Sequence, residues 1–177
     1  MKAGVLSKIG DILGDFINWA RSNSIFVLHY CTGCGAVEIS PTLTSRYDMT
    51  RFGIQPVATP RQADVLLITG YLSLKTLKRV IWAYEQMSAP KYVVGFGSCT
   101  INGGHYWDSY ATINLLDLYL PVDLYIAGCM PRPEAIIEGF EVLKKKIKSG
   151  EPGGWIDYER RKDWYKANQR RLFGDKI

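Results

Sequence analysis

Four cysteines are the residues of this 177-residue chain whose type and spacing point most directly to chemistry. Cys31 and Cys34 form a Cys-x-x-Cys pair, whereas Cys99 and Cys129 stand singly further along the chain. Thiols bind zinc, form disulfides and hold iron–sulfur clusters, so each of these is a candidate. No stretch has the length and apolar character of a membrane span, and the N-terminus lacks a secretory signal, so we expect the chain to stay in the cytosol. Disulfides are disfavoured in that reducing environment.

The spacing of the cysteines favours a cluster over zinc. Structural zinc usually takes two close pairs, and one pair with two distant single cysteines matches that pattern poorly. A [4Fe-4S] cluster is held by four thiolates, and the glycine-rich segment 95–104 would bring backbone amides close to sulfur without side-chain obstruction. Structural zinc and unconnected buried cysteines stay open as alternatives at this point.

Three of the cysteine positions directly follow predicted strands. Short runs rich in β-branched and aromatic residues, flanked by Gly, Pro or Asp, predict buried strands at 25–30, 65–69, 92–96 and 122–126. The first, third and fourth runs lead into Cys31, Cys99 and Cys129. Because the carboxyl ends of parallel strands share one edge of a sheet, we expect the four thiols to converge there.

Helical patterns between the strands predict the fold class. Ser73 can cap a helix that ends before Pro90, and a second helix begins at Pro133 and stops at Gly150. Strands that alternate with helices predict an α/β fold, a small doubly wound parallel sheet with right-handed crossovers.

Two further segments flank this α/β domain. Apolar residues at steps of one, three and four predict an amphipathic helix over 5–20, so we divide the chain into 1–21, 22–150 and 151–177. The last segment is a basic extension with one helix expected over 159–172, and together with the lysines of 144–148 it supplies much of the net charge of +5. No DNA- or RNA-binding motif accompanies these basic residues, so nucleic acid is not an expected partner.

The chain has an expected electron store but no evident substrate site. It lacks a strand followed by GxGxxG, a phosphate-binding lysine loop and a serine or cysteine triad. The expected role is therefore electron relay. Glu38, four residues after Cys34, either couples proton uptake to reduction or is an ordinary carboxylate at a helix start.

An ordered set of motifs over residues 22–148 resembles a known family. The motifs are Cys31 to Glu38 (CTGCGAVE), Arg46-Tyr47-Asp48, Arg51-Phe52-Gly53, Pro60 to Val65 (PRQADV), Gly97-Ser98-Cys99, Gly103-Gly104, Pro121-Val122-Asp123 and Gly128 to Ala135 (GCMPRPEA). They resemble the small cluster-bearing 20 kDa subunit of respiratory complex I. The same family contains the small subunits of membrane-bound, energy-converting [NiFe]-hydrogenases and of sulfane-sulfur reductase complexes.

The resemblance implies a flavodoxin-like domain with one [4Fe-4S] cluster, the last carrier before a catalytic site on a larger partner subunit. The ligands implied are Cys31, Cys34, Cys99 and Cys129, and Glu38 matches the acidic residue beside the first ligands. Further implied partners are a ferredoxin-like multi-cluster subunit and membrane-arm subunits, with this chain peripheral on the cytoplasmic face of the cell membrane. The N-terminal helix is then expected to lie against the membrane or a membrane subunit.

One departure from complex I bears on the activity. Quinone-reducing members have adjacent first cysteines, whereas Thr32 and Gly33 separate Cys31 from Cys34, as in the hydrogenase branch. The segments 103–110 and 130–133 are more similar to complex I. This mixture favours a ferredoxin-driven, ion-pumping complex that reduces sulfane sulfur or polysulfide, ahead of hydrogen evolution and of quinone reduction. A zinc-stabilised binding module that uses the basic tail is the alternative outside the oxidoreductases.

Overall fold

The computed structural model describes the backbone of residues 2–174, and the side chains of residue 10 and of residues 12–174. The α-helices are α1 (Lys2–Ser22), α2 (Gly35–Thr42), α3 (Leu74–Gln86), α4 (Ser98–Asn102), α5 (Pro133–Lys148), α6 (Gly154–Arg160) and α7 (Lys162–Phe173). The strands are β1 (Ile25–Cys31), β2 (Ile54–Val57), β3 (Val65–Thr69), β4 (Tyr92–Phe96) and β5 (Leu124–Ile126). Short 3-10 turns lie at Met49–Phe52, Pro60–Gln62, Gly104–Tyr106 and Leu116–Leu118.

The five strands form one parallel sheet in the order β2-β1-β3-β4-β5. This is the flavodoxin-like order of doubly wound folds, so the predicted fold class is confirmed. All five residues of β3 and of β4 are buried, as expected for strands covered by helices on both faces.

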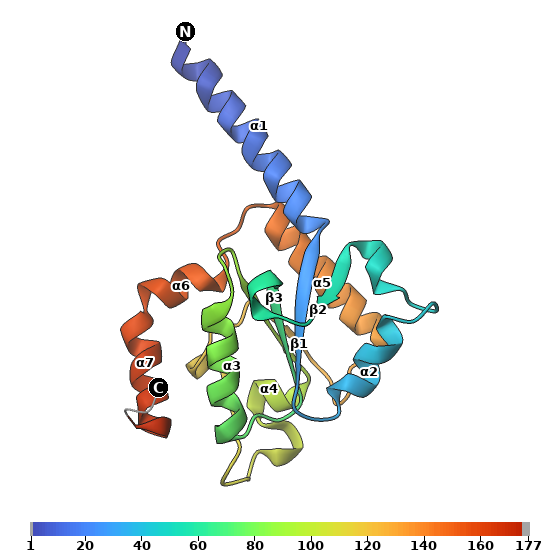
Figure 1. Ribbon diagram of the computed structural model, residues 1–177, viewed down its shortest axis with the longest axis vertical. Helices are drawn as coiled ribbons and strands as arrows, with labels where there is room; N and C mark the ends of the chain where they lie inside the picture. Colours follow the sequence, from blue (N-terminus) through green and yellow to red (C-terminus); the bar gives the residue numbers. More distant parts are fainter. Residues whose placement is uncertain (1, 175–177) are drawn as a thin grey trace.

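Each face of the sheet has its own apolar core. On one face, α3 packs through Leu77 and Val80, and Tyr158 of α6 and Tyr165 of α7 complete the same cluster. On the other face, α2 and α5 cover the sheet, and Phe140 of α5 is fully buried. Figure 1 shows α3, α6 and α7 together on one side and α2 and α5 on the other.

The two helices predicted between strands begin and end as expected. Ser73 caps α3 in a capping box with Thr76, which satisfies two free amides at the helix start. Pro133 is the first residue of α5, and Gly150 follows the helix in a left-handed conformation (φ 71°) that favours glycine.

The structure differs from the prediction in three elements. The edge strand β2 was not predicted, because it has only four residues and includes Pro56, which cannot donate to a ladder. The last strand begins at Leu124, because the Val93 amide donates to the Asp123 carboxylate (2.9 Å). In place of one helix over 159–172, two helices form, with Arg161 outside helical geometry between them.

The N-terminal helix α1 projects away from the rest of the molecule (Figure 1). It leads into the amino end of β1, so it lies at the opposite end of the sheet from the carboxyl edge. The predicted amphipathic pattern includes Val5, Leu6 and Ile9, whose side chains lie outside the described residues. Within the described part of the chain, no helix combines the length and hydropathy that crossing a bilayer requires.

Candidate functional site

All four cysteines lie at the carboxyl edge of the sheet. Cys31 is the last residue of β1, Cys34 precedes α2, Cys99 lies in the first turn of α4, and Cys129 follows β5. Cys34, Cys99 and Cys129 line one pocket. The other residues that line it are Gly35, Gly70, Phe96, Gly97, Ser98, Gly128, Met130 and Pro131. The structure therefore brings together thiols that are distant in sequence.

Cys31 begins the short loop that leads to Cys34 and to this pocket. Its Sγ donates to the carbonyl oxygen of Gly33 (3.1 Å), and its side chain is exposed. Cys34 and Cys129 are exposed as well, whereas Cys99 is buried. Among the residues that the structure describes, no three His, Cys, Asp or Glu side chains are grouped as for a single metal ion.

The buried thiol of Cys99 has a raised pKa. Burial raises its pKa, and the neighbouring Cys34 and Cys129 raise it further because their thiolates would repel a third negative charge. Hydrogen bonds from the backbone amides of His105 and of Cys99 itself act in the opposite direction. The three thiols are thus close enough to influence one another, and amide donors point at the buried sulfur.

Glycines allow the backbone to approach the sulfur atoms. A Cβ on Gly104 (φ 52°) would lie 2.9 Å from the Cys99 backbone nitrogen and 3.1 Å from its Sγ. A Cβ on Gly70 (φ 84°) would lie 2.6 Å from the Gly33 nitrogen, where the end of β3 meets the first cysteine loop. These positions require glycine both for space and for the left-handed backbone.

Hydrogen bonds to Thr69 hold the loop between Cys31 and Cys34 in place. Thr69, fully buried at the end of β3, accepts from the Thr32 amide (3.0 Å) and hydroxyl (2.8 Å) through its carbonyl oxygen. The hydroxyl of Thr69 lies 2.9 Å from Nε2 of His29. Burial lowers the pKa of His29, so this ring is held in its neutral form more strongly than an exposed histidine.

Glu38 lies in the first turn of α2 and is half-buried. It lies near Tyr47, whose hydroxyl donates to Oε1 of Glu134 (2.9 Å) and whose pKa is raised mainly by that hydrogen bond. The pKa of Glu134 is lowered, first by a backbone amide at the start of α5 and then by Tyr47. The carboxylates of Glu38 and Glu134 therefore both lie near one tyrosine next to the cysteine edge.

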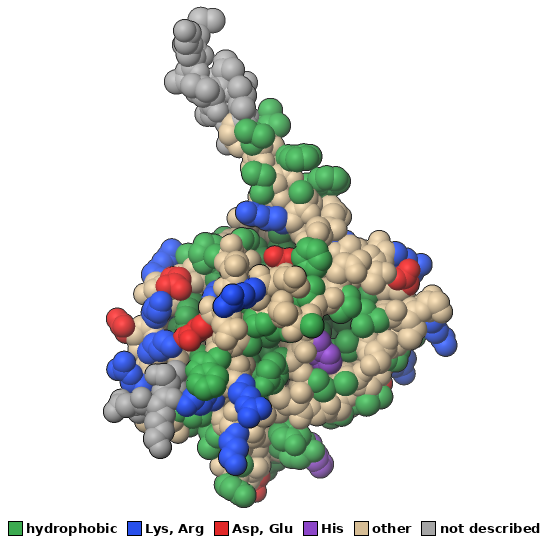
Figure 2. Space-filling view, viewed as in Figure 1, with side chains coloured by type: hydrophobic (Ala, Val, Ile, Leu, Met, Phe, Trp, Pro, Cys, Tyr) green, Lys and Arg blue, Asp and Glu red, His purple; other side chains and the backbone are tan. Residues whose placement is uncertain are grey.

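Exposed apolar side chains surround the pocket on the same edge. Tyr106 packs on Tyr71 with 4.6 Å between ring centroids, and both rings are partly open to solvent. Other exposed apolar side chains on this edge are Val37, Trp107, Tyr110 and Met130. The loop that follows α4 forms the lower end of the molecule in Figure 1, and hydrophobic atoms lie on that end in Figure 2. Apolar groups that are gathered around a site typically mark a protein interface.

Sequence reasoning did not identify Gly70, Thr69 or the Tyr47–Glu134 contact. The strand that ends at Thr69-Gly70 carries no cysteine, so only the glycine directly after a strand could have indicated its place in the pocket. Tyr47 belongs to a motif that the sequence singles out, but its partner lies far away in the chain. Nothing in the spacing of the two residues indicates their hydrogen bond.

Comparisons with known proteins agree with this arrangement. The family model described as NADH ubiquinone oxidoreductase, 20 Kd subunit, matches residues 31–143. An F(420)H(2) dehydrogenase subunit of Methanosarcina mazei is 45% identical over 140 residues, which cover 79% of this chain and 76% of that protein. The chloroplastic NAD(P)H-quinone oxidoreductase subunit K of Phaseolus vulgaris is 44% identical over 142 residues, 80% of this chain and 67% of that protein.

A solved structure is similar over nearly the whole chain. It is a chain in the structure of the membrane-bound sulfane sulfur reductase, described as an archaeal respiratory membrane complex. The identity is 52%, the TM-score is 0.88, and the match covers 92% of each chain.

Proposed function

Because this chain belongs to the family of the NADH ubiquinone oxidoreductase 20 Kd subunit, we propose that its four cysteines hold one [4Fe-4S] cluster. The chain is an electron-transfer subunit of a multi-subunit oxidoreductase. The single observation that carries the proposal is the pocket in which Cys34, Cys99 and Cys129 meet, with Cys31 on the loop that leads to it. When bound, such a cluster takes up and releases electrons at a potential set by its surroundings.

The protein residues fit an anionic, sulfur-rich group. Amides of Cys99 and His105 that point at the Cys99 sulfur would stabilise negative charge on the ligand and on its neighbours. The glycines of the pocket leave the space between the thiols free of side chains. Since the pKa of Cys99 is raised, binding of the cluster must displace a proton from this thiol. Insertion of the cluster is therefore expected to become easier as the pH rises.

We infer that the apolar edge around the pocket contacts the larger catalytic subunit. The thiols of Cys31, Cys34 and Cys129 are exposed, so electrons can leave the pocket over a short distance only if the acceptor site lies against this edge. The rings of Tyr71 and Tyr106 would be covered by that partner and would exclude water from the contact. A ferredoxin-like subunit and membrane-arm subunits complete the proposed assembly, on the cytoplasmic face of the membrane.

The acceptor that we propose is sulfane sulfur. The similarity to the sulfane sulfur reductase chain, at 52% identity over 92% of both chains, exceeds the 45% and 44% identity to the dehydrogenase and quinone-related subunits. Reduction of one sulfur–sulfur bond consumes two electrons and two protons and yields two thiols. The electrons would come from reduced ferredoxin through this chain, and the bond would be cleaved in the partner subunit.

Glu38 is the proposed proton-coupling residue of this chain. Its half-buried carboxylate lies in the first turn after Cys34 and near the Tyr47–Glu134 hydrogen bond, so a proton taken up on reduction has a place close to the cluster. A Glu38→Gln variant should make the reduction potential less dependent on pH. Glu138→Gln on the exposed side of α5 is the matched control and should leave that dependence unchanged.

The test of the function uses the whole complex, purified anaerobically through an affinity tag on this chain. Cys99→Ser should lower the iron and sulfide content of the complex by one cluster. The EPR signal of that cluster should disappear from the spectrum of the dithionite-reduced complex. The substitution should also abolish ferredoxin-dependent polysulfide reduction. Zinc without sulfide in the purified chain would overturn the cluster, whereas an intact cluster with hydrogen evolution or quinone reduction as the main activity would overturn only the acceptor.

A further inference from the structure

One side of α1 is apolar and exposed. The most exposed large apolar side chains on it are Ile12 (68%), Phe16 (62%), Leu13 (55%), Trp19 (51%) and Ile17 (45%). Helical periodicity places these positions on one side, and Figure 2 shows hydrophobic side chains along the projecting helix. Only the last turns of α1 contact the rest of the molecule, where Ser22 is buried and Asn18 lies against Gly150. The apolar side is therefore available to a partner.

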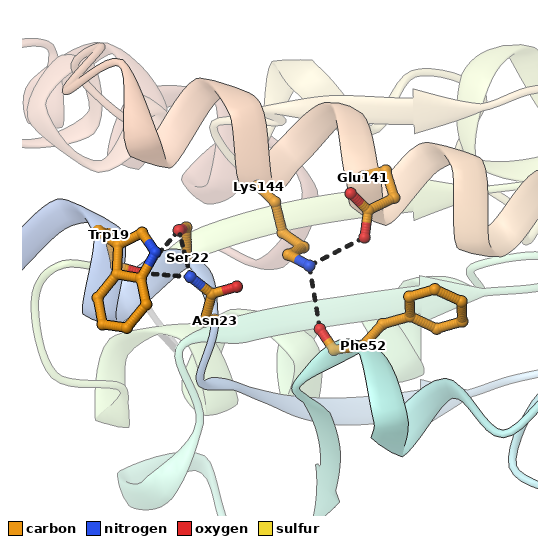
Figure 3. Close-up of polar contacts among 6 residues, drawn as sticks. All are labelled: Trp19, Ser22, Asn23, Phe52, Glu141 and Lys144. Carbon is orange, nitrogen blue, oxygen red and sulfur yellow. Dashed lines mark hydrogen bonds and ion pairs between the residues drawn. The ribbon is translucent and has the colours of Figure 1, made fainter.

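A groove lies where α1 meets α5. It has a volume of about 290 Å³, and its lining residues are Trp19, Ser22, Asn23, Glu141, Lys144, Lys145 and Lys148. Figure 3 shows Trp19 and Asn23 on one side and Lys144 and Glu141 on the other. The carbonyl oxygen of Trp19 accepts from the Ser22 hydroxyl (2.8 Å) and from the side-chain amide of Asn23 (2.8 Å), which fixes the end of α1.

The groove has an excess of positive charge. Lys144 is committed to the protein, because its ammonium donates to Glu141 Oε1 (2.9 Å) and to the carbonyl oxygen of Phe52 (3.1 Å). That contact also neutralises the only acidic side chain of the lining. Lys145 and Lys148 are exposed and have no ion-pair partner among the described residues. Two ammonium groups are therefore free to bind an anion beside the Trp19 ring.

We propose that this groove binds the headgroup of an anionic phospholipid while the apolar side of α1 lies in the membrane interface. Charge complementarity selects this occupant, because lysines beside an amphipathic helix attract anionic lipid and a tryptophan at the boundary suits the headgroup region. Asp15 is exposed on α1, and its charge opposes binding, so the lysines of α5 are needed to favour the anionic surface. The proposal does not depend on the cluster or on the acceptor.

The test is cosedimentation of the full chain with vesicles of phosphatidylcholine, with or without phosphatidylglycerol. Each exposed lysine contributes about fivefold to binding at an anionic surface, so Lys145→Gln with Lys148→Gln should weaken binding to anionic vesicles about thirtyfold. Binding to neutral vesicles should stay the same. The matched control is Lys75→Gln with Arg79→Gln on α3, which removes the same charge elsewhere and should change binding by less than about threefold.

A second variant separates the apolar contact from the charge. Phe16→Ser removes an exposed ring without opening the core, and it should weaken binding to both kinds of vesicle. Equal binding of wild type and the Lys145/Lys148 variant to anionic vesicles would overturn the headgroup site. Absence of vesicle binding, with retention of the chain by the rest of the complex in detergent, would assign this surface to a membrane subunit and would also overturn the proposal.

Discussion

Replacement of Gly104 by alanine tests whether this glycine is required beside the buried cysteine. At φ 52° the residue is in the left-handed region, where a Cβ costs about 1–2 kcal/mol. The new Cβ would also lie 2.9 Å from the Cys99 nitrogen and 3.1 Å from its Cα and Sγ. Overpacking of this kind costs about 1–3 kcal/mol. The free energy of unfolding should therefore fall by about 2–5 kcal/mol, a large part of the stability of a typical domain.

The control for Gly104→Ala is Gly150→Ala. Gly150 also has a left-handed backbone (φ 71°), but its Cβ would meet only the flexible end of the Asn18 side chain at 3.1 Å. This variant should lose only the conformational cost, about 1–2 kcal/mol. The difference between the two variants thus isolates the contact with Cys99.

The assay is equilibrium urea unfolding of the anaerobically purified chain, followed by iron and sulfide analysis after cluster reconstitution. Gly104→Ala should be less stable than Gly150→Ala and should retain less iron, because displacement of the Cys99 sulfur changes the spacing of the thiols. Equal stability and equal iron content in the two variants would refute the reasoning, since the Cys99 loop would then accommodate a Cβ without cost.

Two further predictions concern buried polar groups. Tyr84→Phe should raise the free energy of unfolding by about 1 kcal/mol, because the buried hydroxyl has no hydrogen-bond partner among the described residues; a loss measured by urea unfolding would contradict this. Burial raises the pKa of Asp123 above its ordinary value of 3.8, so the folded chain holds this proton more tightly than the unfolded chain. Its contribution to stability is therefore present below pH 3.8 and lost as the pH rises through the raised pKa. Asp123→Asn should flatten that part of the stability profile and should add a pH-independent loss of about 1–3 kcal/mol from one missing acceptor for the Val93 or Gly154 amide. If the free energy of unfolding of the variant depended on pH as it does in the wild type, another group would be responsible for that dependence.

The parallel sheet and the convergence of the cysteines at one edge could be predicted from the sequence because both depend on local patterns. Apolar runs that end at or shortly before Cys31, Cys99 and Cys129 specify buried strands, and a parallel sheet necessarily gathers their carboxyl ends. The capped start of α3 at Ser73 and the stop of α5 at Gly150 depend on single residues with strong positional preferences.

What the sequence could not supply depends on contacts between distant segments. The edge strand β2 is extended because it pairs with β1 through Ile54, not because its four residues strongly favour a strand. The break at Arg161 follows from packing, since Tyr158 and Tyr165 must both reach the core on the α3 face. The place of Gly70 in the pocket likewise depends on its approach to Gly33.

The burial of Tyr158 and Tyr165 has a consequence for the order of events during synthesis. These rings belong to the same apolar cluster as Leu66 and Leu77, so the core on that face stays incomplete until the ribosome has released α6 and α7. All four cysteines are translated earlier. Synthesis of this subunit therefore includes an interval in which every thiol has been made while the apolar core on the α3 face still lacks two of its aromatic rings.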